Sequence, residues 1–140
     1  MGTEPILAAD YGRDVLGRLR RVMLHRPTEA LRLITAANCR RWLWDGVPDI
    51  GRFTDEHDRY RALLESCGVE VVELADCVAD PGCVRRLPNL IYLHDTAVIS
   101  RRGALLSAMA SPARRGEERV VKEALTHLGV PILIEMDDPA

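Results

Sequence analysis

A short phrase occurs twice in this chain and constrains the fold more than any other feature. Each copy ends a segment of helical periodicity, places a glycine directly after it, and continues with valine into an apolar run. The copies lie at 66–71 and 127–132. Glycine is typical of the position after a helix, because it adopts the left-handed backbone there at little steric cost. A short run of branched apolar residues then indicates a strand. The sequence therefore predicts two copies of an α/β module.

The first module is predicted from a strand, a helix and a second strand. Residues 20–25 are typical of a strand that ends before Pro27, because proline donates no hydrogen bond to a sheet. Residues 28–44 are expected to form a loop with a short helix. Segment 49–67 predicts a longer helix, and a strand follows at 69–74. The apolar stripe expected on this helix comprises Ile50, Phe53, His57, Tyr60, Leu64 and Cys67.

The second module has the same order with more strands at its start. A helix is predicted at 113–128, with Gly129 as its cap, and a last strand at 130–134. The strands before that helix are expected at 90–92, 96–100 and 104–109, with Arg101-Arg102-Gly103 as a tight turn. On pattern alone this is a mixed α/β protein.

Size and composition predict a single domain over residues 1–140. Hydrophobic residues make up 47% of the chain and charged residues 29%, which is ordinary for a globular domain. A net charge of -2 gives no broad attraction to nucleic acid or to anionic lipid, so neither is expected as a partner. Residues 1–10 lack the basic start and long apolar run of a signal peptide, and no segment is long and apolar enough to span a membrane. A cytoplasmic location is expected.

The cysteines give no sign of a metal or redox site. They lie at positions 39, 67, 77 and 83, without a C-x-x-C pair or a nearby pair of histidines. In a cytoplasmic protein they are expected to be reduced, half-buried small residues. No metal and no cofactor is predicted.

Asp95 is the residue that most needs a chemical explanation. It follows the apolar run 90–93, which is predicted to be a strand. A carboxylate in such a place is costly unless a cation or several donors satisfy it. It would suit a guanidinium ligand, which it can hold through two parallel charge-assisted hydrogen bonds. Two structural alternatives remain: Asp95 caps the turn into the next strand, or it pairs with an arginine of this chain.

The segment around Asp95 resembles a known superfamily. It reads Pro88-Asn89-Leu90-Ile91-Tyr92-Leu93-His94-Asp95-Thr96, and Ala-Arg-Arg-Gly-Glu follows at 113–117. Arginine deiminases and amidinotransferases share a Pro-Asn-x-x-(Phe/Tyr)-x-Arg-Asp strand, a hairpin and an Ala-Arg-Arg-Gly-Glu helix start. Upstream segments resemble the family's opening strand, its Leu-Phe-Asp loop and its first helix–strand unit, and the resemblance runs from Gly12 to Glu135. These upstream segments are 12–27, 42–45, 56–58 and 68–71.

The resemblance implies a partial pentein-type propeller, with about two α/β modules of the five-module fold. The chemistry it implies is covalent: a cysteine thiolate attacks the guanidinium carbon, a histidine moves protons, and carboxylates hold the guanidinium nitrogens. Asp95 matches the first of these carboxylates and is the expected catalytic and substrate-binding residue. Leu43, Asn89 and Arg114 match residues that grip the amino-acid end of the substrate. The alternative for Arg114 is an exposed charge in the first turn of a helix.

Two departures from the family pattern shape the functional hypothesis. His94 stands where the family has arginine, and the expected Glu-Gly-Gly-Asp strand, histidine segment and nucleophilic cysteine do not follow by 137–140. The chain is therefore expected to be a subunit or fragment of a split enzyme that acts on a small guanidino compound such as arginine. Its partner would be a complementary C-terminal half, or a second copy of itself. The alternatives are an inactive module that binds a guanidino ligand or a protein partner, and an unrelated α/β protein. Deimination, dihydrolysis and amidine transfer all stay open.

Overall fold

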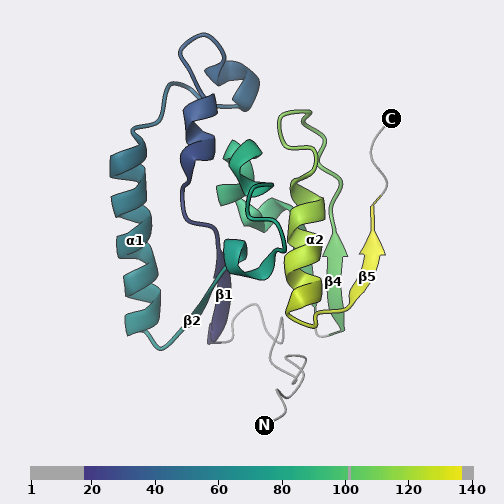
Figure 1. The fold of residues 1–140 in the computed structure, drawn as a ribbon. Coiled ribbons are helices and arrows are strands. Elements are labelled where there is room, and N and C mark those ends of the chain that lie inside the picture. The colour runs from purple at the N-terminus through teal and green to yellow at the C-terminus, as the bar shows by residue number, and fades with distance from the viewer. Residues whose placement is uncertain (1–17, 101, 137–140) are drawn as a thin grey trace.

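The computed structural model describes residues 18–100 and 102–136 and has a mixed α/β fold (Figure 1). The first unit consists of β1 (Arg21–Leu24), α1 (Ile50–Ser66) and β2 (Glu70–Glu73). The second consists of β3 (Ala97–Ser100), β4 (Gly103–Leu106), α2 (Glu117–His127) and β5 (Ile132–Glu135). The strands form a two-stranded sheet β1-β2 and a three-stranded sheet β3-β4-β5. The predicted mixed α/β class is confirmed, as are both predicted helices and the strands next to them, and the predicted turn residue Arg101 lies outside the described residues.

The two units share a strand–helix–strand arrangement. β1 pairs with β2 in parallel across α1, and β4 pairs with β5 in parallel across α2, while β3 adds an antiparallel strand to β4. α1 begins where the Asp49 side chain accepts a hydrogen bond from the backbone N–H of Arg52. Both helices end at the glycines that the sequence indicated: Gly68 and Gly129 have φ angles of 76° and 74°.

The core lies between α2 and the central strand β4. Ala104 and Leu106 of β4 are buried, as are the side chains of α2 that face them. The buried residues on α2 are Glu117, Val120, Val121, Ala124 and Leu125. By contrast, α1 buries none of its residues, and Tyr60 and Cys67 of its predicted stripe are exposed. α1 therefore lies at the side of the structure, as Figure 1 shows.

Two elements near the candidate site differ from the sequence prediction. The predicted strand 90–92 is wrong: Pro88–Ile91 and Leu93–Asp95 are successive 3-10 turns. Pro88 begins the first turn, where its missing N–H is no loss. The second helix begins at Glu117 instead of 113, because Gly116 has a φ of 96° and interrupts the helix there.

A smaller apolar cluster holds the long loop before α1. Leu31, Ile34 and Cys39 are buried there, and Trp42 and Trp44 pack against them with other half-buried side chains. Ile91, in the turn that precedes Asp95, belongs to the same cluster. This packing brings the loop 42–44 next to the segment 88–95. Among residues 18–100 and 102–136, no helix has the length and apolar character that a membrane crossing requires.

Candidate functional site

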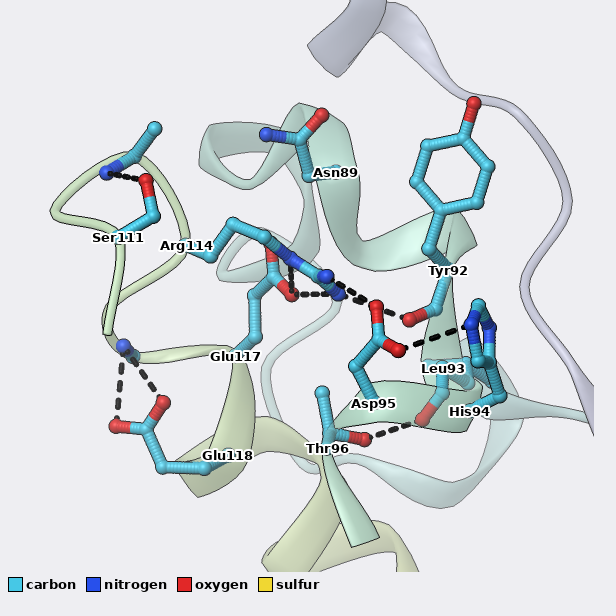
Figure 2. Close-up of polar contacts among 12 residues, drawn as sticks. Asn89, Tyr92, Leu93, His94, Asp95, Thr96, Ser111, Arg114, Glu117 and Glu118 are labelled. Carbon is cyan, nitrogen blue, oxygen red and sulfur yellow. Dashed lines mark hydrogen bonds and ion pairs between the residues drawn. The ribbon is translucent and has the colours of Figure 1, made fainter. Parts of the chain in front are cut away.

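Asp95 lies at the end of a 3-10 turn, directly before β3 (Figure 2). The turn is closed by Thr96, whose backbone N–H and side-chain hydroxyl both donate to the carbonyl of Leu93, at 3.0 and 2.6 Å. The Asp95 side chain is 41% exposed. The turn therefore fixes the backbone of Asp95, while part of its side chain is open to solvent.

Arg114 reaches this carboxylate from the loop between β4 and α2. Its Nη1 donates to Asp95 Oδ2 at 2.5 Å, and its Nη2 donates to the carbonyl of Tyr92 at 2.9 Å. The side chain is only 11% exposed. Burial opposes its charge, but the hydrogen bonds that Arg114 donates to Glu117 and Asp95 outweigh this and raise the pKa of Arg114 above its ordinary value. The alternative of an exposed charge in a first helical turn is wrong, because Arg114 is buried and precedes the helix.

Both oxygens of the Asp95 carboxylate have a partner within the chain. His94 Nε2 lies 2.9 Å from Oδ1, and the His94 ring itself is largely exposed. The pairing of Asp95 with an arginine of this chain, one of the two structural alternatives, is thus observed. This pairing leaves acceptor capacity on the carboxylate, since each oxygen accepts two hydrogen bonds.

Glu117 completes the cluster and was not assigned a role from the sequence. It is fully buried, and its Oε2 accepts from Arg114 Nε at 2.9 Å and lies 2.8 Å from Arg114 Nη2. Its Oε1 has no hydrogen-bond partner among the described residues. Burial raises the pKa of Glu117 to about 7, although its contact with Arg114 acts in the opposite direction. The signal in the sequence was its spacing of three residues from Arg114, which is usually a surface pair.

Asn89 fastens the loop that carries Leu43 to the segment before Asp95. Its side chain is buried, accepts from Trp44 Nε1 at 2.7 Å and donates to the carbonyl of Trp42 at 3.0 Å. The Trp44 ring also lies against Tyr92, with 6.1 Å between ring centroids. Asn89 thus positions neighbouring segments, whether or not it also contacts a ligand.

Leu43 stands between the two tryptophans in an unusual conformation. Its φ of 67° lies in the left-handed region, and its side chain is 62% exposed. A branched apolar residue adopts this backbone at a cost, and such residues cluster at functional sites. The predicted site residues therefore fall into two groups: Asp95 contacts Arg114, and Asn89 contacts Trp42 and Trp44, which flank Leu43.

The four cysteines lie among the described residues and differ in burial. Cys39 and Cys77 are buried, Cys83 is half-buried and Cys67 is exposed, and all are free. Burial raises the pKa of the Cys77 and Cys83 thiols above the ordinary value. A raised pKa leaves less thiolate at neutral pH, and the thiolate is the nucleophile. Among the described residues, no group of three or more His, Cys, Asp or Glu side chains is arranged to hold a metal ion.

Thiol labelling of the native chain is expected to follow exposure. Cys67 should react with Ellman's reagent first, and Cys77 at least tenfold more slowly, because Cys77 is buried and its thiol is protonated. Cys67→Ser should remove the fast phase, and Cys77→Ser should leave it unchanged. Mass spectrometry after partial labelling with chloroacetamidine, an alkylating amidine, identifies the thiol that reacts first. Rapid labelling of Cys77 or Cys83 would contradict this prediction.

Comparison with known proteins gives relatives over part of the chain, while no family model matches it. Arginine deiminases of Rhodococcus opacus and Mycobacterium tuberculosis are each 45% identical over 65 residues, which is 46% of this chain and 16% of each relative. The chain is similar in structure to dimethylarginine dimethylaminohydrolase. A mutant of that enzyme from Pseudomonas aeruginosa, complexed with citrulline, matches with a TM-score of 0.64 and 20% identity over 86% of this chain and 43% of that one.

A second structure of dimethylarginine dimethylaminohydrolase, an adduct with 4-chloro-2-hydroxymethylpyridine, gives the same result. Its TM-score is 0.63 at 20% identity, over 87% of this chain and 42% of that chain. The chain therefore spans less than half the length of the proteins whose fold it shares, and the sequence match spans about a sixth of the arginine deiminases. Over part of its length, this chain resembles the arginine deiminase and amidinotransferase superfamily, as the motifs around Asp95 predicted.

Proposed function

We propose that this chain supplies the guanidinium-binding part of a guanidino-modifying enzyme, and that a partner chain supplies the catalytic cysteine and histidine. One observation carries the proposal: the Asp95 carboxylate is held in place by Arg114 and still 41% exposed. Each of its oxygens has one position left for a further hydrogen bond. Two such positions on one carboxylate suit the planar fork of a guanidinium group.

The relatives favour arginine or a compound close to it as the ligand. The proteins with 45% identity are named for arginine, and a structural neighbour is complexed with citrulline. In the proposed site Asp95 holds the guanidinium end, and the exposed Leu43 lies on the loop that covers the amino-acid end. Arg114 and Asn89 support the two sides through their contacts with Asp95 and with the Trp42–Trp44 loop.

The partner chain is proposed because no cysteine among the described residues forms a hydrogen bond with the Asp95 carboxylate. The described thiols are free, and those of Cys77 and Cys83 have raised pKa values. We assign the chain about two modules of a five-module pentein propeller, in keeping with its 42–43% coverage of the structural neighbours. β5 is an edge strand with Leu133, Ile134 and Met136 exposed around it, which is typical of a surface that another chain covers. A complementary half is the proposed occupant, and a second copy is the alternative.

A second candidate function is supported by the same cluster. Because Arg114 and His94 already contact both Asp95 oxygens, the carboxylate has partners without any ligand. That arrangement also suits a catalytically inactive module that binds a guanidino ligand or a protein partner.

Co-expression separates the two candidates. The full chain is produced with a candidate partner that carries Glu-Gly-Gly-Asp, histidine and cysteine segments, and citrulline formation from L-arginine is measured. The proposal expects a stable complex with activity, while the isolated chain self-associates and is inactive. A monodisperse monomer without affinity for any such partner would contradict the split-enzyme function. L-Arginine binding without turnover in the complex would favour the inactive module.

A further inference from the structure

Glu117 is a buried carboxylate whose two oxygens have unequal surroundings. Oε2 contacts both Nε and Nη2 of Arg114, at 2.9 and 2.8 Å, whereas Oε1 has no partner among the described residues. The side chain has 0% exposure, so bulk solvent does not reach it. Burying a carboxylate with an unpaired oxygen lowers stability. The packing of α2 alone therefore does not explain why a glutamate occupies this position.

We propose that Glu117 is a positioning residue for the guanidinium site and acts through Arg114. By holding the Nε and Nη2 edge of the Arg114 guanidinium, it directs Nη1 to Asp95 and so fixes the carboxylate that receives the ligand. This inference rests on the proposed function for its ligand, but the orientation of Arg114 is measurable without one.

The contacts of Arg114 explain why one carboxylate is sufficient to fix it. A guanidinium group is planar, so two contacts along one edge set the direction of the opposite edge. Glu117 takes that first edge, and the Tyr92 carbonyl takes a further N–H of Nη2. Nη1 then faces Asp95 Oδ2 at 2.5 Å (Figure 2). These contacts hold the Arg114 side chain in one orientation, and in that orientation it positions Asp95.

The strength of this hold changes with pH. Burial, Glu118 and Asp95 all favour the neutral form of Glu117, and Arg114 favours the ionised form; the pKa of Glu117 is about 7. A hydrogen bond to a charged group is stronger than one to a neutral group. Above pH 7 the ionised Glu117 therefore holds Arg114 firmly, and below pH 7 the neutral acid holds it more weakly.

The test follows the Arg114 Nε–H by ¹⁵N NMR in the full 140-residue chain. The signal is assigned by its loss in Arg114→Lys, and its exchange with solvent is normalised to that of free arginine. The wild-type chain should protect this proton at least tenfold more at pH 8 than at pH 6. In Glu117→Gln the protection should equal the low-pH value at every pH.

Glu118→Gln is the matched control. Glu118 is the next residue of α2, and its carboxylate accepts from the backbone N–H of Gly116 instead of from Arg114. Its replacement should leave the protection at pH 8 unchanged and move the midpoint of the pH profile slightly lower, because the Glu118 charge favours the neutral form of Glu117. A wild-type profile that is flat between pH 6 and 8, or equal effects of both substitutions, would overturn the positioning role.

Titration with L-arginine separates this inference from the proposed function. The affinity of Glu117→Gln at pH 8 should fall at least threefold, to the value of the wild-type chain at pH 6. If the Arg114 proton behaves as expected and L-arginine does not bind, the proposed function fails and the orientation of Arg114 by Glu117 stands. If L-arginine binds equally to both proteins at every pH, the positioning role is wrong and the ligand site stands.

Discussion

Replacement of Arg114 by methionine is expected to lower the free energy of unfolding by about 3–5 kcal/mol, the usual cost of removing one partner of a buried ion pair. Methionine keeps much of the side-chain length but removes the cation that contacts both Glu117 and Asp95. Glu117 is then left in the core without a counter-ion. Urea unfolding at pH 8, followed by circular dichroism, measures the effect.

The loss should depend on pH with a defined sign. In the folded chain the pKa of Glu117 is raised from 4.5 to about 7, so the stability linked to its neutral form is present below 4.5 and is lost as pH rises through 7. Without Arg114 the ionised form is worse still, and the deficit of Arg114→Met should shrink from pH 8 to pH 5. Adding Glu117→Gln to this variant should recover part of the deficit at pH 8.

Arg119→Met is the control for loss of an arginine near the same helix. Arg119 is exposed on α2, so its replacement should change the unfolding free energy little. If both variants lose the same stability, or if the deficit of Arg114→Met is independent of pH, the buried cluster does not have the energetic role given to it.

The order of elements was predictable because its signals are local. The glycines after both helices and Pro27 after β1 act within one or two turns of the chain, and the structure places them as expected. The segment 88–95 was not predictable in this way. A short apolar run fits a strand, a helix or a turn equally well by periodicity. Its turns are set by contacts from afar, such as the bonds of Asn89 to the Trp42–Trp44 loop.

Contacts in the structure explain some of the upstream segments that resemble the superfamily. Arg26, next to Pro27, donates to both oxygens of Asp58 on α1 at 2.8 Å, and its backbone N–H donates to Glu73. Three segments that seemed separate along the sequence therefore hold one unit together. The role of Glu117 could not be predicted from the sequence. Its spacing of three residues from Arg114 was visible there, but the burial of this pair depends on tertiary packing.

Asp95→Asn is the change expected to affect ligand binding most. Asparagine keeps the size of the side chain, removes its charge and presents an N–H₂ group where one acceptor stood. Charge-assisted hydrogen bonds contribute about 1.5–3 kcal/mol, so the affinity for L-arginine or its turnover in the assembled enzyme should fall at least tenfold. The bond from Arg114 Nη1 can still form to the amide oxygen, and the melting temperature should therefore fall only slightly.

Asp58→Asn provides the matched control for this prediction. Asp58 is 46% exposed, close to the 41% of Asp95, and it too is paired with an arginine of the chain. Asp58 lies on α1 and its partner Arg26 follows β1, and neither of these described residues forms a hydrogen bond or ion pair with Asp95 or Arg114, so loss of the pair should lower the melting temperature slightly and leave L-arginine affinity unchanged. If Asp95→Asn behaves in the same way, with reduced stability and intact affinity, Asp95 is a structural partner of Arg114 and not a ligand-binding carboxylate. Loss of affinity in Asp95→Asn alone assigns the guanidinium to Asp95, because the two variants lose the same charge beside the same kind of cation.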